Sequence, residues 1–582
     1  MTTIKGKDAP LEESISRFKS ILNKLNIEVI ESGWLNPLAN VFSVHLALAS
    51  CQEIYSNGKG SSKLAALASA YGELFERLGT HMAFSDYFLG LKNAEDDFVH
   101  FRDEKWTPIE DDSEDIPTEI LNSTLRKFYL DENEVRLEDL IDLQSSSFSR
   151  GVCSIPFKSA RNGEIVYFPI NLLDNLYGSN GMSAGNTEYE ALVQGISEII
   201  ERYVKSQIIK KGISLPQIPE DILQKYPKSF ETYKALQGGG IKAICFDASL
   251  GGQFPVVCVV LLNQRNGTCV ASFGSHPIFE AALDRTLTEL MQGRTFCDLD
   301  NFDEPTFDLN RTSDVVNIES HFVDSTGLLP MQMFKDRPDY KFVSWDFSGS
   351  TKEQYDALRH MISKLGFELY IRRYDNLGVP VYRAIIPGMS EIYPIDDLVY
   401  NNLNAAIDFQ ESLLSLPSSN EPPQTYADYL DELESEDFEN EALVCNAIGI
   451  MPDENSSWAS LRFGELKCLL ALASKKWDEA LEYARWTVSY NLENFPLDKL
   501  LFYKCLSSVL EALSYDNVDA NDYKQAFSSL YGDETYLNVM SHINGTKRFN
   551  NLKDSDLNLN GFEAHKELIR IYGIIKGALI EE

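Results

Sequence analysis

The residues of this chain best suited to chemistry are glutamates spaced along two predicted helices. The first segment reads Ser69-x3-Glu73-x2-Glu76-Arg77, where x is any residue. Carboxylates three or four residues apart lie on one helix face and repel one another by about a few tenths of a kcal/mol per pair. Divalent cations relieve such repulsion, and Mg²⁺ is held by carboxylates together with phosphate oxygens. The adjacent serine and arginine therefore indicate a site for Mg²⁺ and a phosphate-bearing ligand.

A second segment repeats this signature over three helical turns. Its members are Ser183, Glu190, Gln194, Glu198, Glu201 and Arg202. On a helix the glutamates and the glutamine form one narrow stripe opposite an apolar side. An ordinary solvated face is the alternative, but no lysine occurs from residue 185 to residue 204 to mix the charges. Glu190 alone has another explanation, because Thr187-x2-Glu190 has the spacing of a capping box.

The helix that carries the first segment is predicted to be buried on all sides. Apolar residues surround it, and apart from a glycine only the four motif residues interrupt them. A helix that is apolar all round is a buried helix, so its two carboxylates should either take up protons or bind cations. Pairing of each glutamate with an arginine of its own helix is the structural alternative. A third short element, Arg285-x3-Glu289, follows later in the chain.

Small-residue loops precede both carboxylate helices, at residues 56–62 and 179–187. Glycines let a backbone approach a ligand closely, and a helix N-terminus presents free N–H groups to an anion. Neither loop fits G-x4-G-K-[ST], which excludes a P-loop. Taken alone, each loop is better explained as a plain turn with a helix cap.

Hydrophobic periodicity predicts the elements that must position these residues. Helices are expected at 14–27, 63–78, 187–206, 278–294 and 351–366. Strands are expected at 41–49, 242–248, 253–263, 268–273, 341–347, 367–373 and 379–386. This alternation predicts a mixed α/β or α+β domain over residues 1–415.

The composition changes after that domain. Residues 416–442 are acidic, contain several prolines and are predicted to be a linker, with either a solvated helix or a mobile tether in their acid-rich part. Residues 443–582 are predicted to form an all-α domain with helices at 458–473, 477–490, 496–513 and 561–580. These helices faintly resemble tetratricopeptide (TPR) hairpins, but a plain helical bundle explains them equally well because the repeat is not sustained.

Net charge and composition exclude several classes of partner. The net charge of −36 argues against nucleic acid and anionic membranes, and it favours a basic protein partner. The nine cysteines are an odd number without a C-x2-C pair, as expected for buried residues in a reducing compartment. No secretory signal begins the chain, and the longest apolar run, 254–262, is too short to span a bilayer. We expect a cytoplasmic protein.

Together, the three motifs resemble the signature of the YcaO superfamily. That signature is Sx3ExxER, then Sx6Ex3Qx3ExxER, then RxxxE, and each fixed position is matched here in order. The stretch Ser179-Asn-Gly-Met-Ser-Ala-Gly185 before the second helix also fits the family. The length and the helical C-terminal region are similar to those of a bacterial member. The resemblance implies a YcaO-type ATP-binding domain that uses ATP and Mg²⁺.

The family's ligand contacts carry over position by position. The resemblance implies metal binding by Glu73, Glu76, Glu190, Glu198, Glu201 and Glu289. It implies nucleotide or phosphate contacts by Ser69, Arg77, Ser183, Gln194, Arg202 and Arg285. Similarity to the bacterial member adds Lys7 and Ser14, although Lys7 is also explained as a free lysine near the terminus. No catalytic nucleophile is apparent.

The family's chemistry is activation of a peptide amide by ATP, which converts the amide oxygen into a phosphate leaving group. Azoline-forming members commonly end in a proline-rich tail, and this chain has no proline after Pro496. A bacterial member of this architecture is associated with β-methylthiolation of a small-subunit ribosomal protein by RimO. Two hypotheses follow: an ATP-dependent enzyme acting on a protein or peptide, or a non-catalytic nucleotide-binding scaffold whose C-terminal helices recruit partners. A homodimer is expected in either case.

Overall fold

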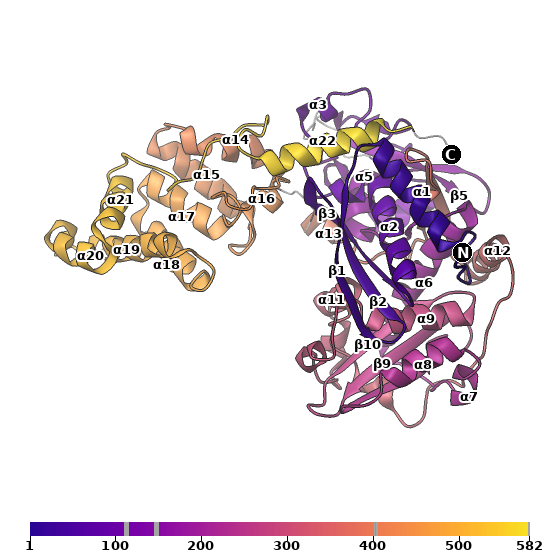
Figure 1. The fold of residues 1–582 in the computed structure, drawn as a ribbon. Helices are drawn as coiled ribbons and strands as arrows, with labels where there is room; N and C mark the ends of the chain where they lie inside the picture. The colour runs from indigo at the N-terminus through magenta and orange to yellow at the C-terminus, as the bar shows by residue number, and fades with distance from the viewer. Residues whose placement is uncertain (110–115, 145–149, 401, 403–405, 580–582) are drawn as a thin grey trace.

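Figure 1 shows a mixed α/β part and, beside it, a helical part. The structure is a computed structural model that describes residues 1–109, 116–144, 150–400, 402 and 406–579. This arrangement confirms the predicted fold class, an α+β domain followed by a helical region. No helix of the described residues is both long and apolar enough to cross a membrane.

The first sheet supplies one wall of the site. It is an antiparallel meander of β1, β2 and β3, which span Val29–Leu38, Val41–Leu48 and Cys51–Gly60. α2 (Lys63–Gly79) packs directly on β3, because a glycine stands at the contact: a Cβ atom on Gly58 would lie 2.0 Å from the Ala66 carbonyl oxygen. α1 (Leu11–Lys24) packs along α2 and adds its apolar face to the same core.

α2 is less buried than its sequence indicates. Leu74 and Phe75 are fully buried, but Leu64 is 36% exposed and Leu67 is half-buried. The all-round burial predicted for this helix is therefore wrong, because α1 and β3 cover only part of its circumference. The four motif residues are half-buried on the side that faces the cavity described below.

The second sheet is covered by helices on both faces. Its order is β10-β9-β8, with β8 at Ile241–Asp247, β9 at Val256–Asn263 and β10 at Cys269–Ser275. Along β9, Val256, Cys258 and Val260 join the core under α6 (Glu188–Lys211), whereas alternate residues join the core under α9 (Phe279–Leu290). Alternation of side chains along a strand explains why this sequence is apolar at nearly every position. The sheet holds α6 and α9 in fixed relative positions.

The third sheet combines early and late parts of the chain. Its order is β4-β5-β11-β12-β7, with β6 paired to β5. The strands span Lys105–Thr107 (β4), Val152–Ser159 (β5), Ile165–Pro169 (β6), Met182–Ala184 (β7), Tyr370–Tyr374 (β11) and Val381–Ile385 (β12). β7 pairs with β12, Ser183 opposite Tyr382, and so a late strand fixes the segment that leads into α6.

The strand predicted at 341–347 is wrong. These residues form no ladder; the Val343 N–H instead donates to the Asp247 carboxylate (2.9 Å) and the Phe347 N–H to the Pro277 carbonyl oxygen (3.1 Å). Phe342 and Trp345 pack against the core under α9. The apolar residues of this segment therefore reflect its partial burial against α9, and the extended segment pairs with no strand among the described residues.

The remaining helices of the α/β part surround these sheets. They span Leu91–Ala94 (α3), Ser123–Arg126 (α4), Ile170–Tyr177 (α5), Glu220–Leu223 (α7), Pro227–Ala235 (α8), Leu309–Ser313 (α10), Val315–Val323 (α11), Thr351–Lys364 (α12) and Asp397–Tyr400 (α13). α12 packs on α6, and α8 packs on α9.

The helical part has its own core. Its helices span Gln410–Ser415 (α14), Pro423–Ser435 (α15), Val444–Ala447 (α16), Phe463–Ser474 (α17), Trp477–Tyr490 (α18), Leu497–Leu513 (α19), Lys524–Tyr531 (α20) and Asp533–Ile543 (α21). α15 lies inside the stretch predicted to be a linker, and its Tyr426, Leu430 and Leu433 are buried in this core. The acid-rich stretch was predicted to be either a solvated helix or a mobile tether, and the structure shows a helix as far as Ser435. The domain limits and the TPR likeness stay predictions.

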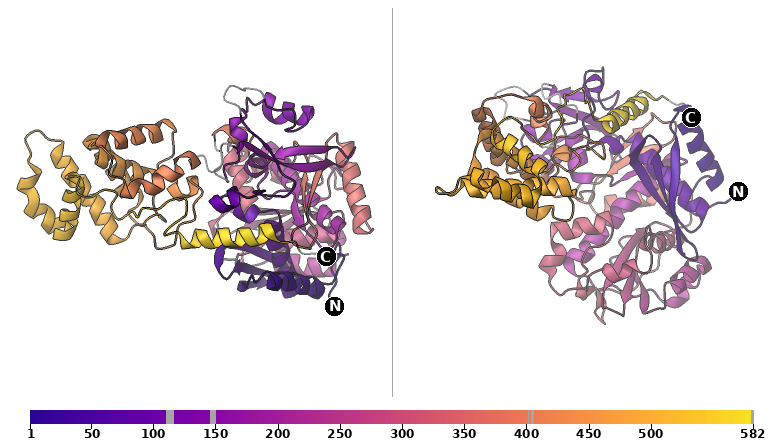
Figure 2. Two further views of the ribbon diagram at one scale, coloured as in Figure 1. Left: turned by 90° about the horizontal axis from the view of Figure 1, so that it is seen from above. Right: turned by 60° about the vertical axis from the view of Figure 1, so that its left-hand side comes forward.

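The last helix returns to the α/β part. α22 (Glu563–Gly577) runs from the helical part along the first sheet, as Figures 1 and 2 show. Leu568, Ile571 and Ile575 belong to the same core as α1 and α2, and the Tyr572 hydroxyl donates to the Val99 carbonyl oxygen (2.6 Å). The helix predicted at 561–580 exists, but it completes the N-terminal core.

Candidate functional site

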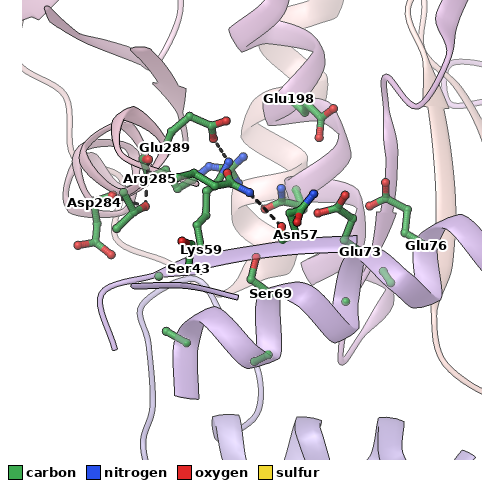
Figure 3. A pocket seen from close by; sticks show the side chains of 18 of the residues that line it. Ser43, Asn57, Lys59, Ser69, Glu73, Glu76, Glu198, Asp284, Arg285 and Glu289 are labelled. Atoms are coloured by element: carbon green, nitrogen blue, oxygen red, sulfur yellow. Dashed lines mark hydrogen bonds and ion pairs between the residues drawn. The ribbon is translucent and has the colours of Figure 1, made fainter. Parts of the chain in front are cut away.

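A cavity of about 760 Å³ lies between α1, β3, α2, α6 and α9. Each predicted site residue except Ser183 lines it: Lys7, Ser14, Ser69, Glu73, Glu76, Arg77, Glu190, Gln194, Glu198, Glu201, Arg202, Arg285 and Glu289. The structure thus brings together three motifs that are separated by more than two hundred residues of sequence. Figure 3 shows Glu73, Glu76 and Glu198 pointing into the same space, with Arg285 and Glu289 across from them.

Helix caps set where the two motif helices begin. The Ser62 hydroxyl accepts from the Ala65 N–H (3.1 Å) at the start of α2. The Thr187 hydroxyl accepts from the Glu190 N–H (3.3 Å) at the start of α6. Such caps satisfy N–H groups that have no partner inside the helix. They fix the register of both helices, and therefore the side on which their glutamates emerge.

Most of the candidate metal ligands are paired with basic side chains of the same cavity. Arg77 lies 2.7 Å from Glu73, Arg202 lies 3.1 Å from Glu198, and Arg285 lies 3.9 Å from Glu201. Lys59 forms an ion pair with Glu289. The structural alternative, pairing within each helix, is therefore present in α2 and α6. These pairs also place basic groups beside each carboxylate, where a phosphate bound to a metal ion would need them.

Glu76 differs from the other carboxylates. Among the described residues, no basic group lies within ion-pair distance of it. Burial, and then the negative charges of Glu198 and Glu73, raise its pKa well above the usual range. Burial also raises the pKa of Glu73, although Arg77 opposes the shift. Carboxylates whose pKa is shifted in this way by burial and by like charges occur often at functional sites.

The N-terminal segment closes one end of the cavity around Glu190. This glutamate is 3% exposed, lies 3.2 Å from the Lys7 ammonium group, and accepts the Asp8 N–H (2.8 Å) and the Asn186 amide (2.9 Å). Burial alone would raise the pKa of Glu190, but Lys7 and these hydrogen bonds lower it. Ser14 donates to the Asn186 side chain (2.7 Å). Lys7 is therefore not a free terminal lysine, and Glu190 is not the acceptor of a full capping box.

Ser183 lies beneath the cavity wall. It is fully buried in β7, and its hydroxyl has no hydrogen-bond partner among the described residues. A Cβ atom on Gly195 of α6 would lie 3.0 Å from this hydroxyl, so α6 packs tightly over it. In this structure Ser183 thus supports the α6 wall and does not line the cavity.

Sequence reasoning missed two lysines of the cavity, Lys59 and Lys205. Lys59 stands near the end of β3 in a stretch that the sequence indicated was a loop; β3 instead continues to Gly60 and pairs Lys59 with Ser43. Burial, and then the nearby Arg285 charge, lower the pKa of Lys59 to about 8. Lys205 is 7% exposed, and its ammonium group donates to the His321 carbonyl oxygen (2.7 Å) at the end of α11. The Gly-Lys-Gly spacing was the available signal for Lys59.

The donor set fits a divalent cation with a phosphate ligand. Carboxylate oxygens are hard ligands of the kind that Mg²⁺ prefers, and the Arg285 Nε atom is buried without a partner in the described residues. In those residues no three carboxylate, histidine or cysteine side chains are arranged closely enough to hold a metal between them. Except for Glu76, the candidate ligands are instead paired with basic groups, which would compete with a metal ion for them.

Sequence comparison agrees with this geometry. Residues 57–390 match the sequence model of the family described as YcaO cyclodehydratase, ATP- and Mg²⁺-binding, and residues 406–579 match the YcaO cyclodehydratase C-terminal domain. The chain belongs to the YcaO family. The three motifs that line the cavity lie in the part of this YcaO protein that matches the family's ATP- and Mg²⁺-binding domain, whereas Lys7 and Ser14 precede the matched residues.

Two relatives match this YcaO chain over nearly its whole length. A protein of Escherichia coli (strain K12), named ribosomal protein S12 methylthiotransferase accessory factor YcaO, is 44% identical over 571 residues, 98% of this chain and 97% of that protein. An uncharacterized protein of Haemophilus influenzae is 44% identical over 578 residues, 99% of this chain and 98% of that protein.

Solved structures of more distant proteins are also similar. YcaO from Methanopyrus kandleri bound with AMPPCP and Mg²⁺ is 18% identical, covers 68% of this chain and 94% of that chain, and gives a TM-score of 0.42. A heterocyclase in complex with substrate and cofactor is 17% identical, covers 67% of this chain and 55% of that chain, and gives a TM-score of 0.44. Similarities of this degree do not locate a ligand in this chain.

Proposed function

We propose that this YcaO protein binds ATP together with Mg²⁺ in the cavity between α2, α6 and α9. The observation that carries the proposal is the convergence of three separate motifs on one cavity, with carboxylates and basic groups interleaved. The metal would be held by Glu73, Glu76, Glu198, Glu201 and Glu289, with Glu190 at the Lys7 end. The nucleotide would contact Lys7, Ser14, Ser69, Arg77, Ser183, Gln194, Arg202 and Arg285.

The chemistry proposed for this site is the family's activation of a peptide amide. ATP, when bound, would supply the phosphoryl group that converts an amide oxygen into a good leaving group. The chain's own contribution is positioning and charge neutralisation: Arg77 and Arg202 sit on facing helices and direct guanidinium donors into the cavity. Donors fixed in a partly desolvated site stabilise a transferring phosphoryl group without reorganising during the reaction.

For the biological role, we propose an accessory function in β-methylthiolation of a small-subunit ribosomal protein. The name of the Escherichia coli relative, which is 44% identical over nearly the full length, supports this role. The net charge of −36 favours association with a basic protein substrate. RimO as a partner, a homodimer and a cytoplasmic location remain parts of the same proposal.

The alternative is a non-catalytic nucleotide-binding scaffold. It is favoured by large apolar side chains on the outside of the helical part, such as Leu497 (70% exposed), Leu530 (69%) and Leu537 (59%). Exposed apolar residues of this kind often mark protein contacts. Deletion of residues 425–582 is a poor test of this role, because it would remove α22 from the N-terminal core.

ATP turnover separates the two roles. Glu76→Gln and Arg202→Ala should each abolish Mg²⁺-dependent phosphate release if the site acts on ATP, while an exposed control, Glu95→Gln, should not change it. Unchanged turnover in both cavity variants contradicts the enzymatic proposal. If cells tolerate the loss of turnover but lose the biological effect with Leu530→Glu and Leu537→Glu, the scaffold role is correct.

A further inference from the structure

The charges of the cavity are balanced, although the chain as a whole is strongly acidic. Among the described residues that line it, eight lysine or arginine side chains face eight aspartate or glutamate side chains. A triphosphate alone would leave this cavity with excess negative charge, and a divalent cation alone would leave it with excess positive charge. Because isolated charges in a partly desolvated site are costly, each ligand should favour entry of the other.

The Lys59–Glu289 pair is distinct from the arginine pairs of α2 and α6. Arg77 and Arg202 each pair with a glutamate one turn away on the same helix. Lys59 instead extends from β3 to Glu289 on α9, and the two side chains are 23% and 35% exposed (Figure 3). This pair joins two elements across the cavity, and while it holds, the charge of each residue weakens the attraction of the other for a ligand.

Basic groups near Lys59 already define where an anion would lie. Arg285 stands one helical turn before Glu289; one of its terminal nitrogens donates to the Gln194 side-chain oxygen, and its Nε atom has no partner in the described residues. Among the described residues, Lys59 is the lysine that forms an ion pair with Glu289, the glutamate of the third motif. When Glu289 is drawn away by a metal ion, the Lys59 ammonium group is left beside Arg285 and needs an anion.

We propose that Lys59 is a phosphate-binding residue that the ligand-free protein holds on Glu289 and that metal binding to Glu289 releases toward the nucleotide. This inference rests on the proposed binding of ATP and Mg²⁺. While the pair holds, the Lys59 charge competes with a metal ion for Glu289, and the Glu289 charge competes with a phosphate for Lys59. The two ligands therefore help each other bind, and such coupling is reciprocal by thermodynamic necessity.

Opposite shifts in two variants test the exchange. In Lys59→Met, Glu289 has lost its competitor, so Mg²⁺ or Mn²⁺ alone should bind about fivefold or more tightly than to the wild type, while a non-hydrolysable ATP analogue with Mg²⁺ should bind about tenfold more weakly. In Glu289→Gln, Lys59 is freed, so the same analogue in EDTA should bind about fivefold more tightly and the divalent cation more weakly. Isothermal titration calorimetry on the full chain gives each affinity without any turnover.

Controls keep the result specific. Lys59→Arg keeps both charge and pair and should shift neither affinity strongly. Lys63→Met removes an exposed lysine that lies over Trp34 outside the cavity, and it should match the wild type. Thermal unfolding of each variant confirms its fold, and if Lys59→Met fails to fold, Glu289→Gln decides alone.

Each outcome has one meaning. Tighter binding of the cation by Lys59→Met, together with tighter metal-free binding of the nucleotide by Glu289→Gln, supports the exchange. Unchanged or weaker cation binding by Lys59→Met overturns it, even if the wild type binds Mg²⁺ and nucleotide as proposed. If the wild type binds neither ligand, the proposed function fails and this inference fails with it.

Discussion

Glu76→Gln should stabilise the ligand-free protein and at the same time remove its ability to bind Mg²⁺ with nucleotide. In metal-free protein Glu76 has no ion-pair partner in the described residues, and its neighbours Glu198 and Glu73 are also carboxylates. Replacing it with the nearly isosteric glutamine removes this repulsion and leaves the shape of the cavity unchanged. A residue that served only the fold would behave in the opposite way.

The magnitude follows from the electrostatics of the cavity. Two unit charges about 4 Å apart repel by ~4 kcal/mol at an effective dielectric constant near 20. The charges of Arg77 and Arg202 reduce this cost. We therefore expect a gain of about 1–2 kcal/mol in the free energy of unfolding, a fraction of the unscreened repulsion.

The dependence on pH has a defined sign. The pKa of Glu76 is raised in the folded state, so the native protein holds this proton more tightly than the unfolded chain does. Linkage then makes wild-type stability fall as pH rises above the ordinary carboxyl pKa of 4.5, until it passes the raised value. Near pH 4.5, the wild type and Glu76→Gln should have about the same free energy of unfolding. As the pH rises toward neutral, the variant should become increasingly more stable than the wild type.

Urea unfolding in EDTA, followed from about pH 5 to about pH 8, measures this difference. Glu95→Gln, an exposed change outside the cavity, should leave stability unchanged at each pH. Repulsion at Glu76 is contradicted if Glu76→Gln is less stable than the wild type at neutral pH. It is also contradicted if the difference in stability between the two proteins does not grow with pH. Retained binding of the Mg²⁺–nucleotide complex by Glu76→Gln would contradict its role as a ligand.

Three further changes test other contacts. Arg202→Ala should weaken calorimetric binding of Mg²⁺ with an ATP analogue by about tenfold or more, because a charge-assisted donor is lost; equal affinity contradicts its role. Tyr572→Phe should lower the free energy of unfolding in urea by ~1 kcal/mol, since the Val99 carbonyl oxygen loses its donor; no change would mean that water replaces it. Lys499→Met leaves buried Glu465 without its cation at 2.9 Å and should cost the helical part ~3–5 kcal/mol, whereas Lys499→Arg should cost much less.

Most residues of the site could be predicted because they occur at fixed spacings on three helices. The stripes on α2, α6 and α9 could be read from sequence, since residues three and four apart share a helix face. Lys59 could not, because its place in the cavity depends on the pairing of β3 with β2 and on the distance to α9. In the sequence, Lys59 is marked only by the glycines on either side of it, and this pattern is also typical of an ordinary turn.

The errors in the fold have a common physical cause. Periodicity shows which face of an element is buried, but not what buries it. The segment 341–347 is rich in apolar residues, of which Phe342 and Trp345 are partly buried, yet its backbone pairs with no other strand of the described residues. α22 has the apolar face expected of it, but that face completes the core of α1 and α2 at the other end of the chain. In α15, Tyr426, Leu430 and Leu433 carried a helical pattern that its acidic composition obscured.

A crystal structure of the full chain with Mg²⁺ and a non-hydrolysable ATP analogue tests the central claim most directly. We expect a triphosphate between α2, α6 and α9, metal ions bound by Glu76 with glutamates of α2, α6 and α9, and Lys59 moved from Glu289 to a phosphate. A nucleotide bound elsewhere, with Glu73, Glu198 and Glu289 still paired as they are without ligand, would contradict it.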